Sequence, residues 1–333
     1  MRPDPAATPE EHRFAAFVRT LGRGPGRSRA LTREEARDAL SMVLEGEADP
    51  HQVGAFLMLL RYRGEDPAEM AGPVDAARAH MNAHTNAHMG AGPPAGEAGV
   101  DLDWPSYGAG RTRDAPWFLL AALALAHAGH RVLMHGTNEF SRGTTVPEGL
   151  GALGLRPATD RADAAAQLGE TGFAYLPLEA FSPDLKALLD LRRLLGLRSP
   201  LNTAARLLNP FDAPAGVDGV FHPAYIALHL QTADLLGRRR LVVVKGGGGE
   251  AERTPAKAVA AHWFDRAQGR GEATMPPLPG AEGNAGLAEV WHGADGPGAA
   301  TAAATVALGL VALGTAPEQA DVQAAEVWRN RRR

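Results

Sequence analysis

The sequence predicts an α/β protein in which a small N-terminal helical-bundle domain precedes a larger α/β domain with a mostly parallel central sheet. Three observations support this fold class. Apolar residues recur at helical spacing within residues 1–89, a glycine- and proline-rich linker occupies residues 90–99, and short apolar runs alternate with helical segments over residues 100–333. Because strands that alternate with helices build sheets covered by helices, we place the domain boundary in the linker.

Short helices with tight connections make up the predicted helical domain. Thr32 stands three residues before Glu35, which is the spacing of a capping box, and opens a helix through Leu44. Asp66-Pro67 starts a further helix. The apolar stripes of two other helices are Phe14, Phe17, Val18 and Leu21, and Val53, Phe56, Leu57 and Leu60. Such a succession of amphipathic helices is typical of a small antiparallel bundle.

Four short apolar runs are the candidate strands of the α/β domain, at residues 100–102, 131–134, 173–176 and 241–244. The last is a continuous apolar run, typical of a central parallel strand that is buried on both faces. Residues 269–298 are rich in loop-forming residues, and residues 299–314 predict a buried helix. A helical segment near residues 178–195 is expected to pack on the helical domain.

The composition excludes several classes of function. The chain has no cysteine, which rules out disulfides, zinc-thiolate sites and cysteine nucleophiles. Its most apolar stretches, residues 118–126 and 299–313, are shorter than the roughly 18 apolar residues that a membrane span needs. No secretory signal is visible at the start, so we expect a cytoplasmic protein with no membrane partner. The net charge of −4 means that contacts to phosphates must come from local groups of arginines.

A spaced set of polar residues carries a resemblance to a known family. Arg192-Arg193, Gly196, Arg198 and Asn202 keep fixed spacing and are followed by Asn209-Pro210. Together with the N-terminal helices, this pattern resembles the anthranilate phosphoribosyltransferases from about residue 31 to residue 255. The resemblance implies a helical domain beside an α/β domain and a homodimer formed through the helices. It also implies transfer of the phosphoribosyl group of PRPP (phosphoribosyl pyrophosphate) to an amine, with Mg²⁺ as cofactor.

The same resemblance assigns substrate-binding positions. The phosphate turn corresponds to Ser106, Gly108 and Gly110, a second loop begins at His135-Gly136, and the acceptor side corresponds to Arg192 and Asn202. Carboxylates for Mg²⁺ correspond to Glu252, with Glu250 close by. The chain departs from the family at several of these motifs. Pro116-Trp117-Phe118-Leu119 replaces the Asn-x-Ser-Thr motif that grips phosphates, and Ala251 replaces one metal-binding carboxylate.

These departures leave two leading hypotheses open, beside a minor third one, a structural or regulatory dimer with neither activity. The first is a transferase that handles PRPP or a similar phosphorylated small molecule. The second is a non-catalytic dimer that binds nucleic acid through an arginine-lined groove. Pro105-Ser106-Tyr107 and Gly22-Arg23-Gly24 resemble a divergent branch of the family that is associated with nucleic-acid binding. The arginines that would contact phosphates are Arg23, Arg27, Arg111, Arg113, Arg142, Arg193 and Arg198.

Overall fold

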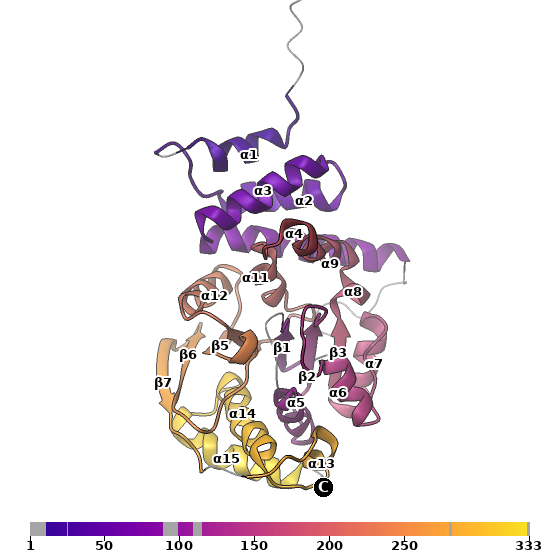
Figure 1. Cartoon of the computed structure of the whole chain (residues 1–333), viewed down its shortest axis with the longest axis vertical. Helices are drawn as coiled ribbons and strands as arrows, with labels where there is room; N and C mark the ends of the chain where they lie inside the picture. The colour runs from indigo at the N-terminus through magenta and orange to yellow at the C-terminus, as the bar shows by residue number, and fades with distance from the viewer. Residues whose placement is uncertain (1–10, 25, 89–98, 109–114, 280–281, 332–333) are drawn as a thin grey trace, which may run out of the picture.

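A helical domain sits at one end of an α/β domain in the computed structural model (Figure 1). The structure describes residues 11–24, 26–88, 99–108, 115–279 and 282–331. The linker expected at residues 90–99 therefore lies almost wholly outside the described residues. The fold class predicted from the sequence, a helical N-terminal domain and a larger α/β domain with a mostly parallel sheet, is confirmed.

Four helices open the chain, and side-chain caps define where two of them start. Thr32 and Glu35 form the predicted capping box, and Asp49 with Gln52 forms a second one. The helices are α1 (Ala15–Gly22), α2 (Arg33–Leu44), α3 (Pro50–Arg63) and α4 (Pro67–His88). At Gly72, an added Cβ would lie 2.4 Å from the backbone oxygen of Arg33. Glycine at this position therefore allows α2 and α4 to touch backbone to backbone.

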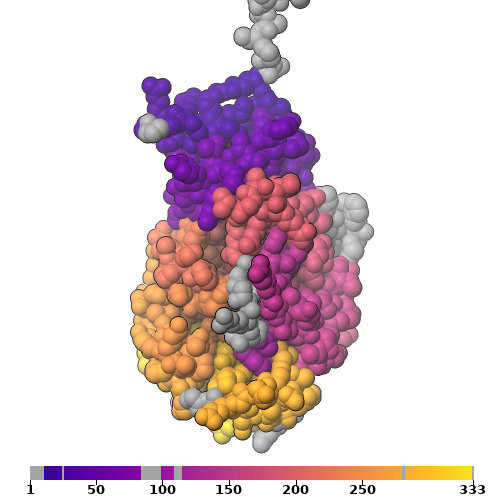
Figure 2. Space-filling model, viewed as in Figure 1, coloured from indigo at the N-terminus to yellow at the C-terminus, as the bar shows by residue number. Residues whose placement is uncertain are grey.

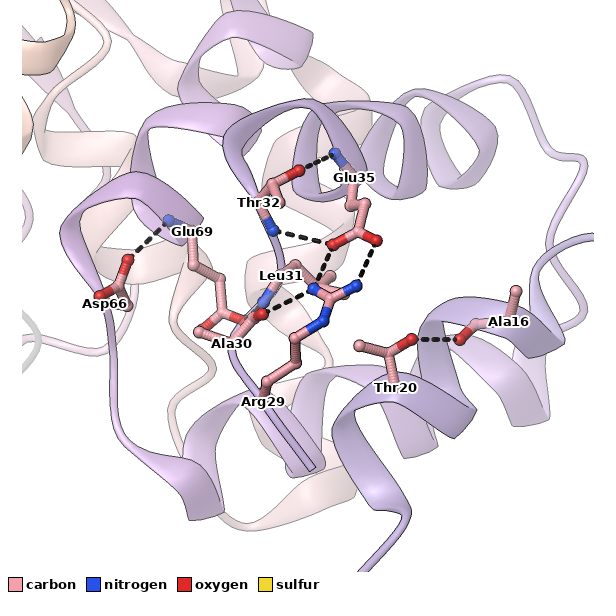
Figure 3. Close-up of polar contacts among 9 residues, drawn as sticks. All are labelled: Ala16, Thr20, Arg29, Ala30, Leu31, Thr32, Glu35, Asp66 and Glu69. Carbon is pink, nitrogen blue, oxygen red and sulfur yellow. Dashed lines mark hydrogen bonds and ion pairs between the residues drawn. The ribbon is translucent and has the colours of Figure 1, made fainter. Parts of the chain in front are cut away.

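The segment that enters α2 is fixed by charged side chains (Figure 3). Arg29 donates two hydrogen bonds to the carboxylate of Glu35, at 2.5 and 2.6 Å. The carboxylate of Glu69, on α4, accepts a hydrogen bond from the backbone N–H of Leu31 at 2.7 Å. Glu69 is 1% exposed, and burial raises its pKa to about 7. Arg29 is therefore engaged within the helical domain and Glu69 is a buried titratable group.

Helices from the middle of the chain pack on α4. Figure 2 shows this part of the chain, in red-pink, seated against the indigo N-terminal helices. His80 on α4 contacts Asp184 at 2.9 Å, and Arg78 donates to the backbone oxygen of Leu208 at 2.6 Å. The helices are α8 (Leu178–Phe181), α9 (Pro183–Asp190), α10 (Arg192–Leu195) and α11 (Leu201–Arg206). The core of the helical domain thus includes residues that are far apart in the sequence.

One seven-stranded sheet, in the order β3-β2-β1-β4-β5-β6-β7, forms the centre of the α/β domain. The first five strands of this order, β3, β2, β1, β4 and β5, run parallel to one another. The pairs β5–β6 and β6–β7 are antiparallel. The strands are β1 (Leu102–Ser106), β2 (Val132–Gly136), β3 (Phe173–Pro177), β4 (Ala215–Val220), β5 (Arg240–Lys245), β6 (Val259–Asp265) and β7 (Gly269–Met275). The carboxyl ends of the five parallel strands share one edge, which is where ligands bind in open α/β sheets.

The sheet departs from the sequence prediction in four places. The first strand begins at Leu102 and not at residue 100, because its buried segment includes Asp103 and Pro105 and lacks an apolar pattern. Strand β4 was not predicted, since Asp218 and two glycines interrupt its apolar residues. Strand β6, which includes His262 and Asp265, was not predicted either. The supposed loop at 269–298 contains β7 and α13 (Leu287–Trp291). Strand β7 lies at the edge of the sheet and is mostly exposed or partly buried, with Met275 as its buried residue, so it has no continuous apolar run.

Helices cover both faces of the sheet. One face packs against α5 (Trp117–His127), α6 (Val146–Ala152), α13, α14 (Pro297–Leu313) and α15 (Pro317–Asn330). The other face packs against α7 (Arg161–Thr171), α12 (Ala224–Leu235) and residues of the helical domain. Within the described ranges, no helix combines the length and apolar character needed to cross a membrane.

Candidate anion-binding cavity at the domain junction

A cavity of about 420 Å³ lies where the helical domain meets the carboxyl end of β4. Three parts of the chain line it. Arg61 comes from the last turn of α3, Glu65 from the connection between α3 and α4, and Arg192 to Arg206 from the α10–α11 segment. The third part is the end of β4 and the helix that follows it, from Val220 to His229. The two domains therefore build this cavity together.

Four guanidinium groups surround the cavity, those of Arg61, Arg192, Arg198 and Arg206. The pKa of Arg198 falls to about 10, first because burial disfavours its charge and then because the other three arginines repel it. Like charges gathered in a partly buried space are stabilised by an anion. The electrostatics of this cavity therefore favour a negatively charged ligand.

Arg206 lies deepest among these arginines. The residue is 8% exposed, and its Nη1 has no hydrogen-bond partner among the described residues. Its Nη2 lies 3.9 Å from Oε1 of Glu250, and its guanidinium stands 5.8 Å from the ring centre of Tyr107. A buried guanidinium nitrogen that lacks an acceptor is costly, so a ligand oxygen at this place would be stabilising.

Glu65 is the acidic side chain in the cavity wall, and three neighbours hold it. Thr203 Oγ1 donates to its carboxylate at 2.8 Å, and the Tyr225 hydroxyl donates at 3.3 Å. Arg61 Nη1 in turn donates to the Tyr225 oxygen at 3.1 Å. Burial raises the pKa of Glu65, which weakens its opposition to a bound anion. This network fixes the orientation of Tyr225 across the domain junction.

A histidine–aspartate pair forms part of the inner wall. His229 Nδ1 lies 2.8 Å from Asp218 Oδ2, and both residues are buried. His229 lines the cavity, and no described residue bonds to its Nε2. Neither residue was predicted from the sequence. The available signal was an aspartate inside the otherwise small and apolar run 215–220, because a buried strand carboxylate requires a partner.

Residues 106–108, the described part of the segment that corresponds to the phosphate turn, pack closely against the protein. Ser106 is buried at the end of β1, and Tyr107 is 4% exposed with its hydroxyl 3.1 Å from His135 Nδ1. A Cβ added to Gly108 would lie 2.8 Å from the carboxylate oxygen of Glu250. Gly110, Arg111 and Arg113 lie outside the described residues.

His135 and Gly136 serve the packing of β2. His135 is buried, and its Nε2 lies 3.2 Å from Asp103 Oδ1, while Asp103 accepts a hydrogen bond from Arg238 at 2.5 Å. Gly136 has φ of 153°, and a Cβ there would lie 1.7 Å from the backbone oxygen of Ser106. Neither residue lines the cavity.

The two carboxylates expected to hold Mg²⁺ are engaged elsewhere. Glu252 accepts a hydrogen bond from the backbone N–H of Phe118, in the first turn of α5, at 3.0 Å. Glu250 is fully buried between Gly108 and Arg206. Across the described ranges, no group of three histidine, aspartate or glutamate side chains is placed to hold a metal ion. The described residues therefore do not fit a Mg²⁺-diphosphate site.

Only part of the predicted arginine set meets at the cavity. Arg198 lines it, as do Arg192 and Asn202 from the predicted acceptor side. Arg192 and Arg193 lie over the ring of Phe140, at 4.7 and 5.8 Å, and Arg193 pairs with Glu139. The arginines that are exposed away from the cavity are Arg23 and Arg27, between α1 and α2, and Arg142, after β2. Arg61, which the fold brings to the cavity from the helical domain, was not predicted as a site residue.

Family models match both domains of the chain. The helical bundle domain of a glycosyl transferase family matches residues 16–81, and the a/b domain of that family matches residues 118–277. An uncharacterized Escherichia coli protein, YbiB, is 29% identical over 255 residues, which is 76% of this chain and 77% of that one. The anthranilate phosphoribosyltransferase of Oleidesulfovibrio alaskensis is 31% identical over 74% of this chain and 71% of that one. The corresponding enzyme of Nitratidesulfovibrio vulgaris is 32% identical over 68% of this chain and 64% of that one.

Solved structures share the fold. The anthranilate phosphoribosyltransferase of Thermus thermophilus superposes with a TM-score of 0.74 at 24% identity, over 96% of this chain and 95% of that one. The enzyme of Saccharomyces cerevisiae in complex with PRPP and Mg superposes with a TM-score of 0.72 at 16% identity, over 96% and 94% of the two chains.

Proposed function

Since the chain belongs to the glycosyl transferase family that includes the anthranilate phosphoribosyltransferases, we propose that it is a nucleic-acid-binding member that does not transfer phosphoribosyl groups. The observation that carries this proposal is the group of four arginines in the wall of the junction cavity. Four arginines line it, and the described carboxylates beside them are Glu65, whose pKa is raised, and Glu250. Phosphate oxygens are the natural acceptors for such a group of guanidinium donors.

The packing of residues 106–108 and the start of α5 support the same proposal. A PRPP diphosphate needs open backbone N–H groups at a helix start and carboxylates for its metal. Here the Glu252 carboxylate lies at the start of α5, and Tyr107 is buried beside the turn. Both features disfavour the chemistry of PRPP and leave the binding of phosphate by arginine intact.

Exposed arginines outside the cavity extend the proposed contact surface. Arg23, Arg27 and Arg142 are exposed, and no described residue pairs with them. Such side chains contact phosphates without reading the base sequence. The proposal includes a homodimer formed through the helical domain, where Tyr62 is 90% exposed, and a cytoplasmic location. A dimer would present two copies of this surface.

One observation favours a second candidate, a transferase that acts on PRPP or a related small molecule. Arg192 and Asn202, which the resemblance assigns to the acceptor side, both line the cavity. If this candidate is right, binding of PRPP depends on Mg²⁺ and on Glu252.

Fluorescence anisotropy with labelled single- and double-stranded oligonucleotides at two salt concentrations tests the proposal. We expect binding that weakens steeply with salt, that excess PRPP with Mg²⁺ does not displace, and that Arg198→Gln weakens. Arg329→Gln is the control, because this exposed arginine lies on α15, against the opposite face of the sheet. No oligonucleotide binding, together with Mg²⁺-dependent PRPP binding in calorimetry, would establish the transferase instead.

A further inference from the structure

We propose that the junction cavity binds a terminal nucleoside phosphate monoester, and that His229 forms a hydrogen bond with the phosphate oxygen that carries the second negative charge. This inference rests on the proposed function, because the end of a nucleic-acid strand is one source of that chemistry. A free nucleotide is the other source. The shared ligand is an aromatic base joined to a doubly charged phosphate.

The depth of the cavity indicates that its ligand is the end of a nucleic-acid strand and not an internal nucleotide. Three residues of its wall are almost completely buried, since Arg206, Thr203 and His229 are 8%, 7% and 2% exposed. Phe221, in contrast, is 53% exposed, and His222 beside it is exposed as well. An internal phosphodiester has chain leaving on both sides, which makes its approach to the buried inner wall less favourable than that of a chain end. A terminal phosphate enters such a cavity with only one connection.

The charge of the inner wall matches a dianion. Arg206 Nη1 is buried and has no hydrogen-bond partner among the described residues, and Arg198 lies in the repulsive field of the neighbouring arginines. A phosphodiester carries one negative charge, whereas a phosphate monoester near neutral pH carries close to two. The monoester therefore balances more of this positive charge.

The Asp218–His229 pair can recognise the extra oxygen of a monoester. Because Asp218 accepts from Nδ1, the atom of His229 left for a ligand is Nε2. With both ring nitrogens protonated, Nε2–H donates to a dianionic phosphate oxygen. With Nε2 unprotonated, it accepts the P–OH hydrogen of the singly charged monoester. In either arrangement one proton lies between His229 Nε2 and a phosphate oxygen. A diester has no oxygen that titrates near neutral pH and so cannot take part in this exchange.

Aromatic groups at the outer part of the cavity fit a base. Phe221 is a large apolar side chain that is half exposed, and the His222 ring meets it edge to face at 4.8 Å. Exposed aromatic rings provide platforms on which bases of any sequence stack. A phosphate on the inner arginines and a base on Phe221 would place one nucleotide across the cavity.

Three single-stranded oligonucleotides of one sequence test the proposal with the full chain: one with a 5′-phosphate, one with hydroxyls at both ends, and a closed circle. We expect the phosphorylated strand to bind about tenfold or more tightly than the other two, since it adds charge-assisted hydrogen bonds. Competition with a nucleoside 5′-monophosphate and with inorganic phosphate shows whether base and phosphate are both recognised.

Variants locate the effect. His229→Gln should reduce the preference for the phosphorylated strand, whereas Arg142→Gln, outside the cavity, should weaken all three strands alike. Because His229 is buried and its replacement can unfold the chain, Phe221→Ala on the exposed side gives an independent test. It should weaken the nucleoside monophosphate more than inorganic phosphate.

The outcomes separate this inference from the proposed function. Equal affinity for the phosphorylated, hydroxyl and circular strands overturns the terminal-phosphate site and leaves nucleic-acid binding in place. Binding of the nucleoside monophosphate without any oligonucleotide supports the cavity chemistry and identifies a free nucleotide as its source, while the proposed function fails. If no strand and no nucleotide binds, both proposals fall.

Discussion

The carboxylate of Glu252 accepts a hydrogen bond at 3.0 Å from the backbone N–H of Phe118, so a side chain of the protein occupies the N-terminus of α5. A helix N-terminus attracts anions through its unpaired N–H groups and its dipole. In this chain a carboxylate from the loop after β5 supplies that anion. The consequence for stability can be measured directly.

Replacing Glu252 with alanine should lower the free energy of unfolding by about 1 kcal/mol, the usual effect of losing a helix cap. Glu252→Gln keeps an oxygen that can accept from Phe118 and should lose less. Urea unfolding followed by circular dichroism measures both variants. Equal loss in the two variants would show that the charge, and not the hydrogen bond, stabilises α5.

Arg198→Gln should reduce the dependence of oligonucleotide affinity on salt. If Arg198 contacts one phosphate, the slope of log K against log salt becomes shallower by about one, and affinity falls for all sequences alike. Anisotropy titrations over a range of salt concentrations give this slope. Arg329→Gln should leave the slope unchanged, and the same shift in both variants would remove the cavity from the proposed interface.

Glu69 should make stability decrease as the pH rises from about 4.5 to about 7. Its pKa is about 7 in the folded chain against an ordinary value of 4.5, because burial disfavours the carboxylate. In this interval the folded state holds a proton that the unfolded state has released, so raising the pH favours unfolding, and the effect levels off above pH 7. The total change is on the order of 3 kcal/mol.

The variant Glu69→Gln isolates this effect, because its amide oxygen can still accept from Leu31 and does not titrate. We expect it to gain stability relative to the wild type between pH 4.5 and pH 8. Urea unfolding of both proteins across this range measures the difference. A constant difference at all pH values would mean that Glu69 titrates normally in the folded chain.

Gly72→Ala should destabilise the chain by about 1–3 kcal/mol, since the added methyl group meets the backbone of α2. Gly54, in α3, is the matched control, because an added Cβ there has no neighbour within 4 Å. Gly54→Ala should stabilise the helix by roughly 0.5–1 kcal/mol. Thermal unfolding of the two variants should therefore shift in opposite directions.

Much of the fold could be predicted from the sequence, because it depends on local patterns. The capping box at Thr32 and the apolar run of β5 each specify their own element. Strand β4 could not be found in this way, because Asp218 interrupts its apolar pattern. The carboxylate of Asp218 is paired with His229 on the next helix, α12. A residue that is polar because of a distant partner carries no local sign of that partner.

The candidate site was predictable only in part for the same reason. Arg192 and Arg198 lie close together in the sequence, and their spacing carried the family resemblance. Arg61 joins them through packing of the helical domain, and Glu65 through its bonds to Thr203 and Tyr225. The occupation of the α5 N-terminus by Glu252 depends on how two loops meet, which no spacing encodes.

The helical domain is completed by α8 to α11, and this has a consequence during synthesis on the ribosome. Helix α4 emerges long before its partners, because residues 201–206 of α11 follow Met81 by 120 positions. At translation rates of roughly 5–20 residues per second, this delay is on the order of ten seconds. For that time the apolar side of the nascent bundle has no native cover, which makes it a natural substrate for chaperones that bind exposed hydrophobic helices.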